Sequence, residues 1–271
     1  MPIILSGGVD GSKSIIQWDN VFMRSVITDV GTQPNHPAIN AARDPSTWSS
    51  WKAVAGSASS FTANVPAGGG NRTNNTLGVA AHNLASTGAS LSLQLSDDGV
   101  TWTLATGIYA PLTDEDFILH FPTLNAQYWR VNLINSNANT SVGVASLGNA
   151  LIMPHAPIDS YTPLHHARKY TKMFNDSIKG QFLGNRVMAA GAETTVDYGF
   201  IPREFADGPL IPFASHYNQG GTFFYAGWPA GKPQDMGYCR ASGDDETVSV
   251  EYIEGHRLAN VSFGLRSYVG A

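Results

Sequence analysis

Cysteine is almost absent from this sequence of 271 residues, which contains only Cys239. A single thiol excludes a disulfide within the chain and a zinc site built from several cysteines. Cys239 stands in the segment Gly-Tyr-Cys-Arg, whose residues suggest no partner for it. We therefore expect a buried structural thiol at this position.

Charge is also scarce. Charged residues make up 14% of the chain, against ~25% in an average soluble domain, and the formal net charge is −5. Lysine and arginine form no basic stripe, so the electrostatic surface expected of a nucleic-acid-binding protein is missing. The sequence predicts no sequence-specific contact with nucleic acid.

Long apolar runs are missing as well. No window approaches the ~18 apolar residues of a membrane-spanning helix, so no membrane partner is expected. The segment MPIILSGGVDGSKS at the start has too few consecutive apolar residues for a secretion signal, which needs ~7–15 of them. We therefore expect synthesis in the cytoplasm without a secretion signal.

The sequence is rich in residues that favour strands and turns. Hydrophobic residues reach 42%, enough for a core, and 28 glycines and 15 prolines punctuate the chain. Between residues 76 and 152, several segments of strand length are separated by turns. In one of them Leu91, Leu93 and Leu95 alternate with polar residues, and Asp97-Asp98-Gly99 follows as a hairpin turn. This pattern predicts an all-β fold with an antiparallel sandwich.

Met153-Pro-His-Ala-Pro157 interrupts the strand pattern and predicts a boundary between two domains, residues 1–155 and residues 156–271. The second domain is predicted to be smaller and β-rich, with at most one short helix, over residues 201–208. Residues 247–253 and 258–265 are predicted to pair as a hairpin. In the first domain, prolines between residues 32 and 45 favour loops over a continuous helix.

Motifs for catalysis or metal binding are not evident. The chain has no Gly-x-Ser-x-Gly, and its cysteine stands in no catalytic motif. Adjacent side chains on a strand point to opposite faces, so His165 and His166 are not expected to share a metal. The sequence leaves open a pair of carboxylates acting on a glycosidic bond, because such a pair need only be close in space. We assign no catalytic residue, no metal and no cofactor.

Aromatic residues in the first domain suggest carbohydrate contact instead. An aromatic ring offers a flat apolar face to a sugar ring, while nearby polar side chains bind its hydroxyl groups. The alternative is that tryptophans of a sandwich fill its core. The candidate contact residues lie in one loop and at the end of one predicted strand: Asp44, Trp48, Trp51, His82 and Asn83.

Four segments in order resemble a discoidin-like, galactose-binding-type jelly-roll over about residues 1–155: Ala42–Trp51, Leu77–Leu84, Leu93–Trp102 and Ala126–Val131. They contain an Asp/Trp loop, a strand ending in His-Asn-Leu, an Asp-Gly hairpin followed by Trp, and a Tyr-Trp-Arg strand.

The continuation of the chain is similar to tail proteins of long-tailed bacteriophages, in which such a module is joined to a β-domain of the distal-tail type. The segments that carry this second resemblance are Leu147–Pro154, Lys179–Arg186 and Phe223–Trp228.

This resemblance implies a structural protein of the virion tail tip, made in the host cytoplasm, that forms a ring between the tail tube and the baseplate. It implies as partners other copies of the chain in a homohexamer, tail tube and baseplate hub proteins, and host surface glycans. The predicted hairpin of residues 247–253 and 258–265 is a candidate seam between copies. Two alternatives stay open, namely a lectin-like carbohydrate-binding module and a glycan-degrading enzyme.

Overall fold

The computed structural model describes residues 3–7, 10–54, 58–66, 72–158 and 161–269. Contacts between Cα atoms divide the chain into two compact units. The first unit consists of Met1–Ala156 and Thr222–Tyr238, and the second of Pro157–Gly221 and Cys239–Ala271. The division of the chain into domains of residues 1–155 and 156–271 stays a prediction.

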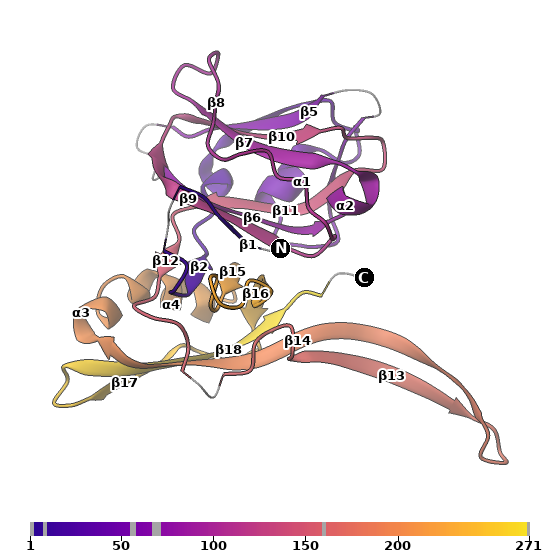
Figure 1. Ribbon diagram of the computed structural model, residues 1–271, viewed down its shortest axis with the longest axis vertical. Helices are drawn as coiled ribbons and strands as arrows, with labels where there is room; N and C mark the ends of the chain where they lie inside the picture. The colour runs from indigo at the N-terminus through magenta and orange to yellow at the C-terminus, as the bar shows by residue number, and fades with distance from the viewer. Residues whose placement is uncertain (1–2, 8–9, 55–57, 67–71, 159–160, 270–271) are drawn as a thin grey trace. The chain divides into compact units, whose positions relative to one another are not determined.

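The first unit is a sandwich of two five-stranded sheets, which confirms the all-β prediction (Figure 1). All strand pairs within the two sheets are antiparallel except β1 with β9. One sheet consists, in spatial order, of β1 (Ile3–Leu5), β9 (Phe117–Asn125), β6 (Thr73–His82), β11 (Ser141–Gly148) and β4 (Trp51–Lys52). The other consists of β3 (Val26–Val30), β5 (Ser59–Asn64), β10 (Tyr128–Ile134), β7 (Ser90–Ser96) and β8 (Thr103–Leu104).

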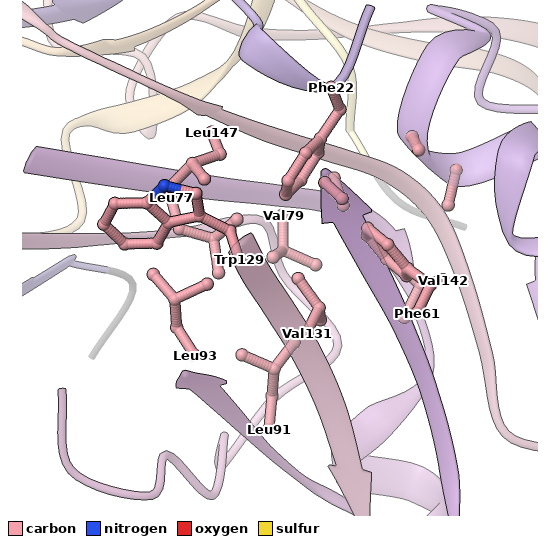
Figure 2. Packing of buried hydrophobic residues seen from close by; sticks show 14 of the residues in the cluster. Phe22, Phe61, Leu77, Val79, Leu91, Leu93, Trp129, Val131, Val142 and Leu147 are labelled. Atoms are coloured by element: carbon pink, nitrogen blue, oxygen red, sulfur yellow. The ribbon is translucent and has the colours of Figure 1, made fainter. Parts of the chain in front are cut away.

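The core of the first unit lies between these two sheets (Figure 2). Alternation along β10 sends Trp129, Val131 and Leu133 inward, where each is buried, while the residues between them are partly exposed. They meet side chains of the facing sheet such as Leu77 and Val79. Because a shift of one residue would expose this whole row, the burial fixes the register of β10.

The helical segments of the first unit are short: η1 (Val21–Arg24), α1 (Ala38–Arg43) and α2 (Leu84–Thr87). The prolines between residues 32 and 45 do not prevent α1, because Pro37 precedes the helix as its N-cap residue. The alanines Ala38, Ala41 and Ala42 pack against the sandwich core.

Three short strands form a second small β arrangement within the first unit. They are β2 (Ile15–Gln17), β12 (Leu151–Ile152) and β15 (Phe223–Ala226), and β2 pairs with both of the others. A Cβ atom at Gly78 of β6 would lie 2.4 Å from the ring of Phe224, so the glycine permits close packing between these strands. This packing explains why the segment around β15 belongs to the first unit.

The second unit is built on an antiparallel sheet with the order β13 (Arg168–Asp176), β14 (Phe182–Pro202), β18 (Leu258–Ser267) and β17 (Ser249–Ile253). The last residues of β16 (Met236–Ala241) also pair with β18. Pairing of β17 with β18 confirms the hairpin predicted from the sequence.

The prediction of at most one short helix in this half of the chain is wrong. The structure has two, α3 (Arg203–Ala206) and α4 (Leu210–Asn218). Pro212 occupies the first turn of α4, where a backbone N–H has no partner within the helix, so a proline there costs no hydrogen bond. Phe213 and Tyr217 then pack their rings against Phe263 of β18.

Candidate functional surfaces

The residues 44–50, here called the Trp48 loop, present one aromatic side chain to solvent. The Trp48 side chain is 95% exposed. Asp44 shapes the loop from within: its carboxylate accepts hydrogen bonds from the Ser46 N–H at 2.9 Å and from the Ser49 hydroxyl at 2.6 Å. The Trp48 N–H donates in turn to the Ser46 hydroxyl oxygen at 3.2 Å. Local turn chemistry therefore holds an indole ring away from the protein surface.

Trp51, the second tryptophan predicted for sugar contact, lies in the sandwich core. It is fully buried, its ring meets Phe61 edge to face, and its indole N–H donates to the Thr32 hydroxyl oxygen at 3.0 Å. A ring enclosed on all sides has no face for a ligand. We therefore leave Trp51 out of the candidate surface.

His82 is also buried and serves the fold. Its Nδ1 atom accepts a hydrogen bond from the Leu84 N–H at 3.3 Å, so its Nε2 atom carries the proton and donates to the Glu115 carbonyl oxygen at 2.9 Å. Burial lowers the pKa of His82, which favours this neutral form. The side chain thus joins the end of β6 to the segment before β9.

Asn83 has a comparable bracing role next to it. Its side-chain oxygen accepts from the Ser141 N–H at 2.7 Å, and its NH₂ group donates to the Asn139 carbonyl oxygen at 2.7 Å. Both bonds fix the turn before β11. The polar atoms of His82 and Asn83 are therefore engaged within the protein.

The structure brings two of the five predicted residues together and leaves one of them, Trp48, almost fully exposed. Trp51 and His82 lie on either side of Val142 in one row across β4, β11 and β6. Only Trp48 projects a ring into solvent, with Asp44 at the base of its loop. What this loop can supply chemically is one free aromatic face, which suits stacking on an apolar or sugar surface.

Asp116 is a buried carboxyl group that sequence analysis did not single out. Its two oxygens accept hydrogen bonds from the Ala81 N–H at 3.3 Å and the Tyr238 N–H at 3.0 Å. Burial raises the pKa of Asp116 to about 7, even though these two hydrogen bonds act in the opposite direction. The group joins three segments of the first unit, and we assign it a structural role.

The second unit carries a surface of a different kind, which we call the arm (residues 168–191). It is formed by β13 and the first half of β14, paired along their length. Every residue of β13 is exposed, on both faces of the strand. Large apolar side chains are exposed throughout the arm: Tyr170, Met173, Phe174, Ile178, Phe182, Leu183, Val187 and Met188.

The arm ends in a turn over residues 177–181 that is fixed by three hydrogen bonds. The Gly180 N–H donates to the Ser177 carbonyl oxygen at 2.8 Å, and the Ser177 N–H donates to the Gln181 carbonyl oxygen at 2.8 Å. The Gln181 N–H donates to the Ser177 hydroxyl oxygen at 3.0 Å. Gly180 has a φ of 76°, a conformation that favours glycine.

Sequence analysis missed the arm, although a signal was present. Residues with strand propensity flank Lys179-Gly180, a pair that favours a turn, so the segment resembles a hairpin. Apolar residues occur on both faces of its strands, however, so the sequence shows no alternation of apolar and polar residues. His165 and His166 lie in a turn and not on a strand. Their rings are 4.0 Å apart, so the expectation that the two side chains point to opposite faces is wrong.

A pocket of about 160 Å³ in the second unit is lined by Tyr217, Asn218, Gly220, Arg240, Ala241, Gly243, Asp244 and Glu246. Binding pockets are typically ~300–1,000 Å³. Among the described residues, no three His, Cys, Asp or Glu side chains are grouped to hold a metal ion. No helix in the described ranges is long and apolar enough to cross a membrane.

Comparison with known proteins gives likenesses of structure only. No protein-family model matches the sequence, and no curated protein matches it. Similar solved structures include a carbohydrate-binding module of family 32 from Clostridium perfringens, CpGH89CBM32-5, solved with GalNAc-β-1,3-galactose. The identity is 14% and the TM-score 0.39, over 47% of this chain and 96% of that one.

Two further structures give the same picture. Chitosan-binding module 2 of the chitosanase/glucanase from Paenibacillus sp. IK-5, solved with chitotriose, has 15% identity and a TM-score of 0.40, over 48% of this chain and all of that one. SpGH29 has 16% identity and a TM-score of 0.40, over 49% of this chain but only 28% of the length of that one. Likenesses at this level assign neither a ligand nor an activity to the chain.

Proposed function

We propose that this chain is a structural subunit of the tail tip of a long-tailed bacteriophage. In this proposal, copies of the chain form an oligomeric ring between the tail tube and the baseplate, and the sandwich of the first unit is an outward module. Its partners are other copies of itself and the proteins of the tail tube and baseplate hub. The role requires neither catalysis nor a cofactor.

The observation that carries this proposal is the exposure of the arm. An isolated two-stranded ribbon is marginally stable in water, and a long, open, apolar strand edge invites pairing with another chain. Phe182 is 91% exposed and Phe174 65% exposed, so burial of such side chains against a partner would be favourable. A subunit that is always assembled can carry this surface, whereas a protein that acts alone would have to cover it.

The test is to locate the chain in virus particles. Antibodies against the purified protein are applied to intact virions in which mass spectrometry detects the chain, and labelled particles are imaged by electron microscopy. We expect label at the tail tip alone. Label on the capsid, or absence of the chain from purified virions, would contradict the proposal.

A second candidate function is contact with host surface glycans, and a specific observation favours it. Trp48 is 95% exposed on a loop whose shape is held by Asp44, and a free indole face is suited to stacking on a sugar ring. This function is compatible with a place at the tail tip, because an outward module would meet the host surface.

Glycan-array binding tests this second function. We expect Trp48→Ala to abolish binding to any glycan that the unmodified chain retains, while Trp102→Ala, in another part of the first unit, leaves that binding intact. Binding that survives Trp48→Ala would exclude the Trp48 loop as the site. Trp51→Ala is unsuitable as a test, since Trp51 belongs to the core.

A further inference from the structure

The sheet of the second unit has two open edges that are suited to each other. Among the described residues, β13 pairs only with β14, and β17 pairs only with β18. These strands lie at opposite ends of β14: β13 is beside residues 182–192, while β17 is beside the part of β18 that pairs with residues 197–202 (Figure 1). The arm therefore extends away from the end that carries β17.

The strand directions permit pairing of these two edges between copies. Each neighbouring pair in the order β13, β14, β18 and β17 is antiparallel, so β13 and β17 run in opposite directions. When two copies have the same orientation, β13 of one and β17 of the other are therefore antiparallel. Antiparallel edges can form a regular hydrogen-bonded ladder without turning either copy over.

The charges of the two edges are complementary. Residues 168–190 contain five basic side chains (Arg168, Lys169, Lys172, Lys179 and Arg186) and one acidic side chain, Asp176. Between Arg240 and Arg257, the residues 241–256, which include β17, contain five acidic side chains and no lysine or arginine: Asp244, Asp245, Glu246, Glu251 and Glu254. Two arms would repel each other, whereas an arm and a β17 edge attract.

We propose that the arm of one copy pairs through β13 with the free edge of β17 in a second copy, head to tail. This inference rests on the proposed assembly and names the surfaces that form it. Because different surfaces meet, the contact is heterologous, and repetition gives a closed ring or an open filament, not an isolated twofold dimer. Apolar side chains of β13, such as Phe174, gain cross-strand neighbours on β17 in this contact, and the basic side chains of the arm lie close to the acidic edge.

Charge reversal on each side tests the pairing. One variant carries Lys172→Glu, Lys179→Glu and Arg186→Glu on the arm, and another carries Glu251→Lys and Glu254→Lys on the β17 edge. A third variant combines all five changes in one chain. Association of the full-length protein is followed by sedimentation velocity across a range of concentrations, and circular dichroism confirms that each variant is folded.

We expect each separate reversal to weaken association at least about tenfold, and the combined variant to recover most of it, because complementary signs face each other again. Lys232→Glu, at an exposed position of the first unit, is the control and should leave association unchanged. Recovery distinguishes a direct contact from general damage to the fold, which a second set of reversals would only increase.

An engineered disulfide provides an independent readout. In the register that places Lys172 of one copy opposite Glu251 of the next, Lys172→Cys combined with Glu251→Cys should give a ladder of covalently joined copies under oxidising conditions, whereas either change alone should not. The native Cys239 is buried and stays outside this reaction. If the chain assembles but neither reversal weakens assembly, the β13–β17 pairing is wrong while the proposed ring stands. If the unmodified chain never associates and is absent from virions, both are wrong.

Discussion

Asp116 shows how a single buried group makes the stability of the first unit depend on pH. Its pKa is about 7 in the folded protein and about 3.8 in the unfolded chain, because burial penalises the charged form. Between these values the folded state holds a proton that the unfolded state has released. This carboxyl group therefore contributes to stability below pH ~4, and the contribution is lost as the pH rises toward 7.

We predict that Asp116→Asn removes this dependence. The free energy of unfolding of the unmodified chain should fall, relative to the variant, by at most about 4 kcal/mol between pH 4 and pH 7. Urea denaturation of both proteins at several pH values in this range measures the difference. A difference that is constant with pH would show that Asp116 is charged in the folded protein.

Replacement of Trp48 and replacement of Trp51 should have very different effects on the free energy of unfolding. We predict that Trp51→Ala lowers the free energy of unfolding by about 3–5 kcal/mol, because it removes a buried ring from the core. Trp48→Ala should change it by no more than about 0.5 kcal/mol, because that side chain is exposed. Urea denaturation of the two variants decides this, and similar losses would mean that Trp48 packs against the protein.

Sequence reasoning located these tryptophans but did not distinguish their positions. Trp48 and Trp51 are three residues apart in a segment with no period, so the chain alone does not say which ring points inward. The pairing of β4 with β11 determines which ring points inward, because it joins residue 51 to residue 142, which is distant in the sequence. In contrast, the alternation of Leu91, Leu93 and Leu95 was sufficient to predict β7, because alternating apolar residues indicate a strand that packs one face on the core.

Among the secondary-structure elements, the arm has the unusual property of adding little to the fold of its own unit. Its β13 strand is exposed on both faces, and the packed part of the sheet begins where β14 meets β18, at Ala192. Alternation of apolar and polar residues, which predicts a strand from sequence, arises when one face of the strand is buried. An element that is exposed on both faces in the isolated chain therefore escapes such prediction.

We predict that the arm can be shortened without loss of folding. Replacing residues 172–188 with Asn-Gly joins Thr171 to Ala189, which are opposite each other in the ladder, through a favoured hairpin turn. The midpoint of thermal unfolding should change by less than about 4 °C, which corresponds to about 1 kcal/mol in a chain of this size. Calorimetry measures this midpoint. Unfolding of the second unit in the shortened chain would mean that the arm supports its core.

The same variant should lose self-association, because the deletion removes all the exposed apolar side chains of the arm except Tyr170 and three of its five basic side chains. Sedimentation velocity provides this second measurement on the same sample. A shortened chain that associates as strongly as the unmodified one would place the contact elsewhere.

For the molecule as a whole, sequence and structure agree most closely where the fold is locally determined. The sandwich strands, the Asp97-Asp98-Gly99 turn and the β17–β18 hairpin follow from alternation and turn residues within a few positions. Membership of residues 222–238 in the first unit does not, because it depends on packing between positions such as Gly78 and Phe224, which are distant in the chain. The proposed role of the arm involves several copies, and a single chain shows only the exposed surface on which that proposal rests.

The central claim is that the chain is built to be repeated around an axis through contacts of its arm. Electron microscopy of the purified full-length protein at high concentration tests it most directly, with particle mass measured on the same sample. We predict closed rings of several copies, with sixfold symmetry, in which the arms are no longer accessible to protease. A monodisperse monomer at every concentration, with arms cleaved readily by protease, would contradict the claim.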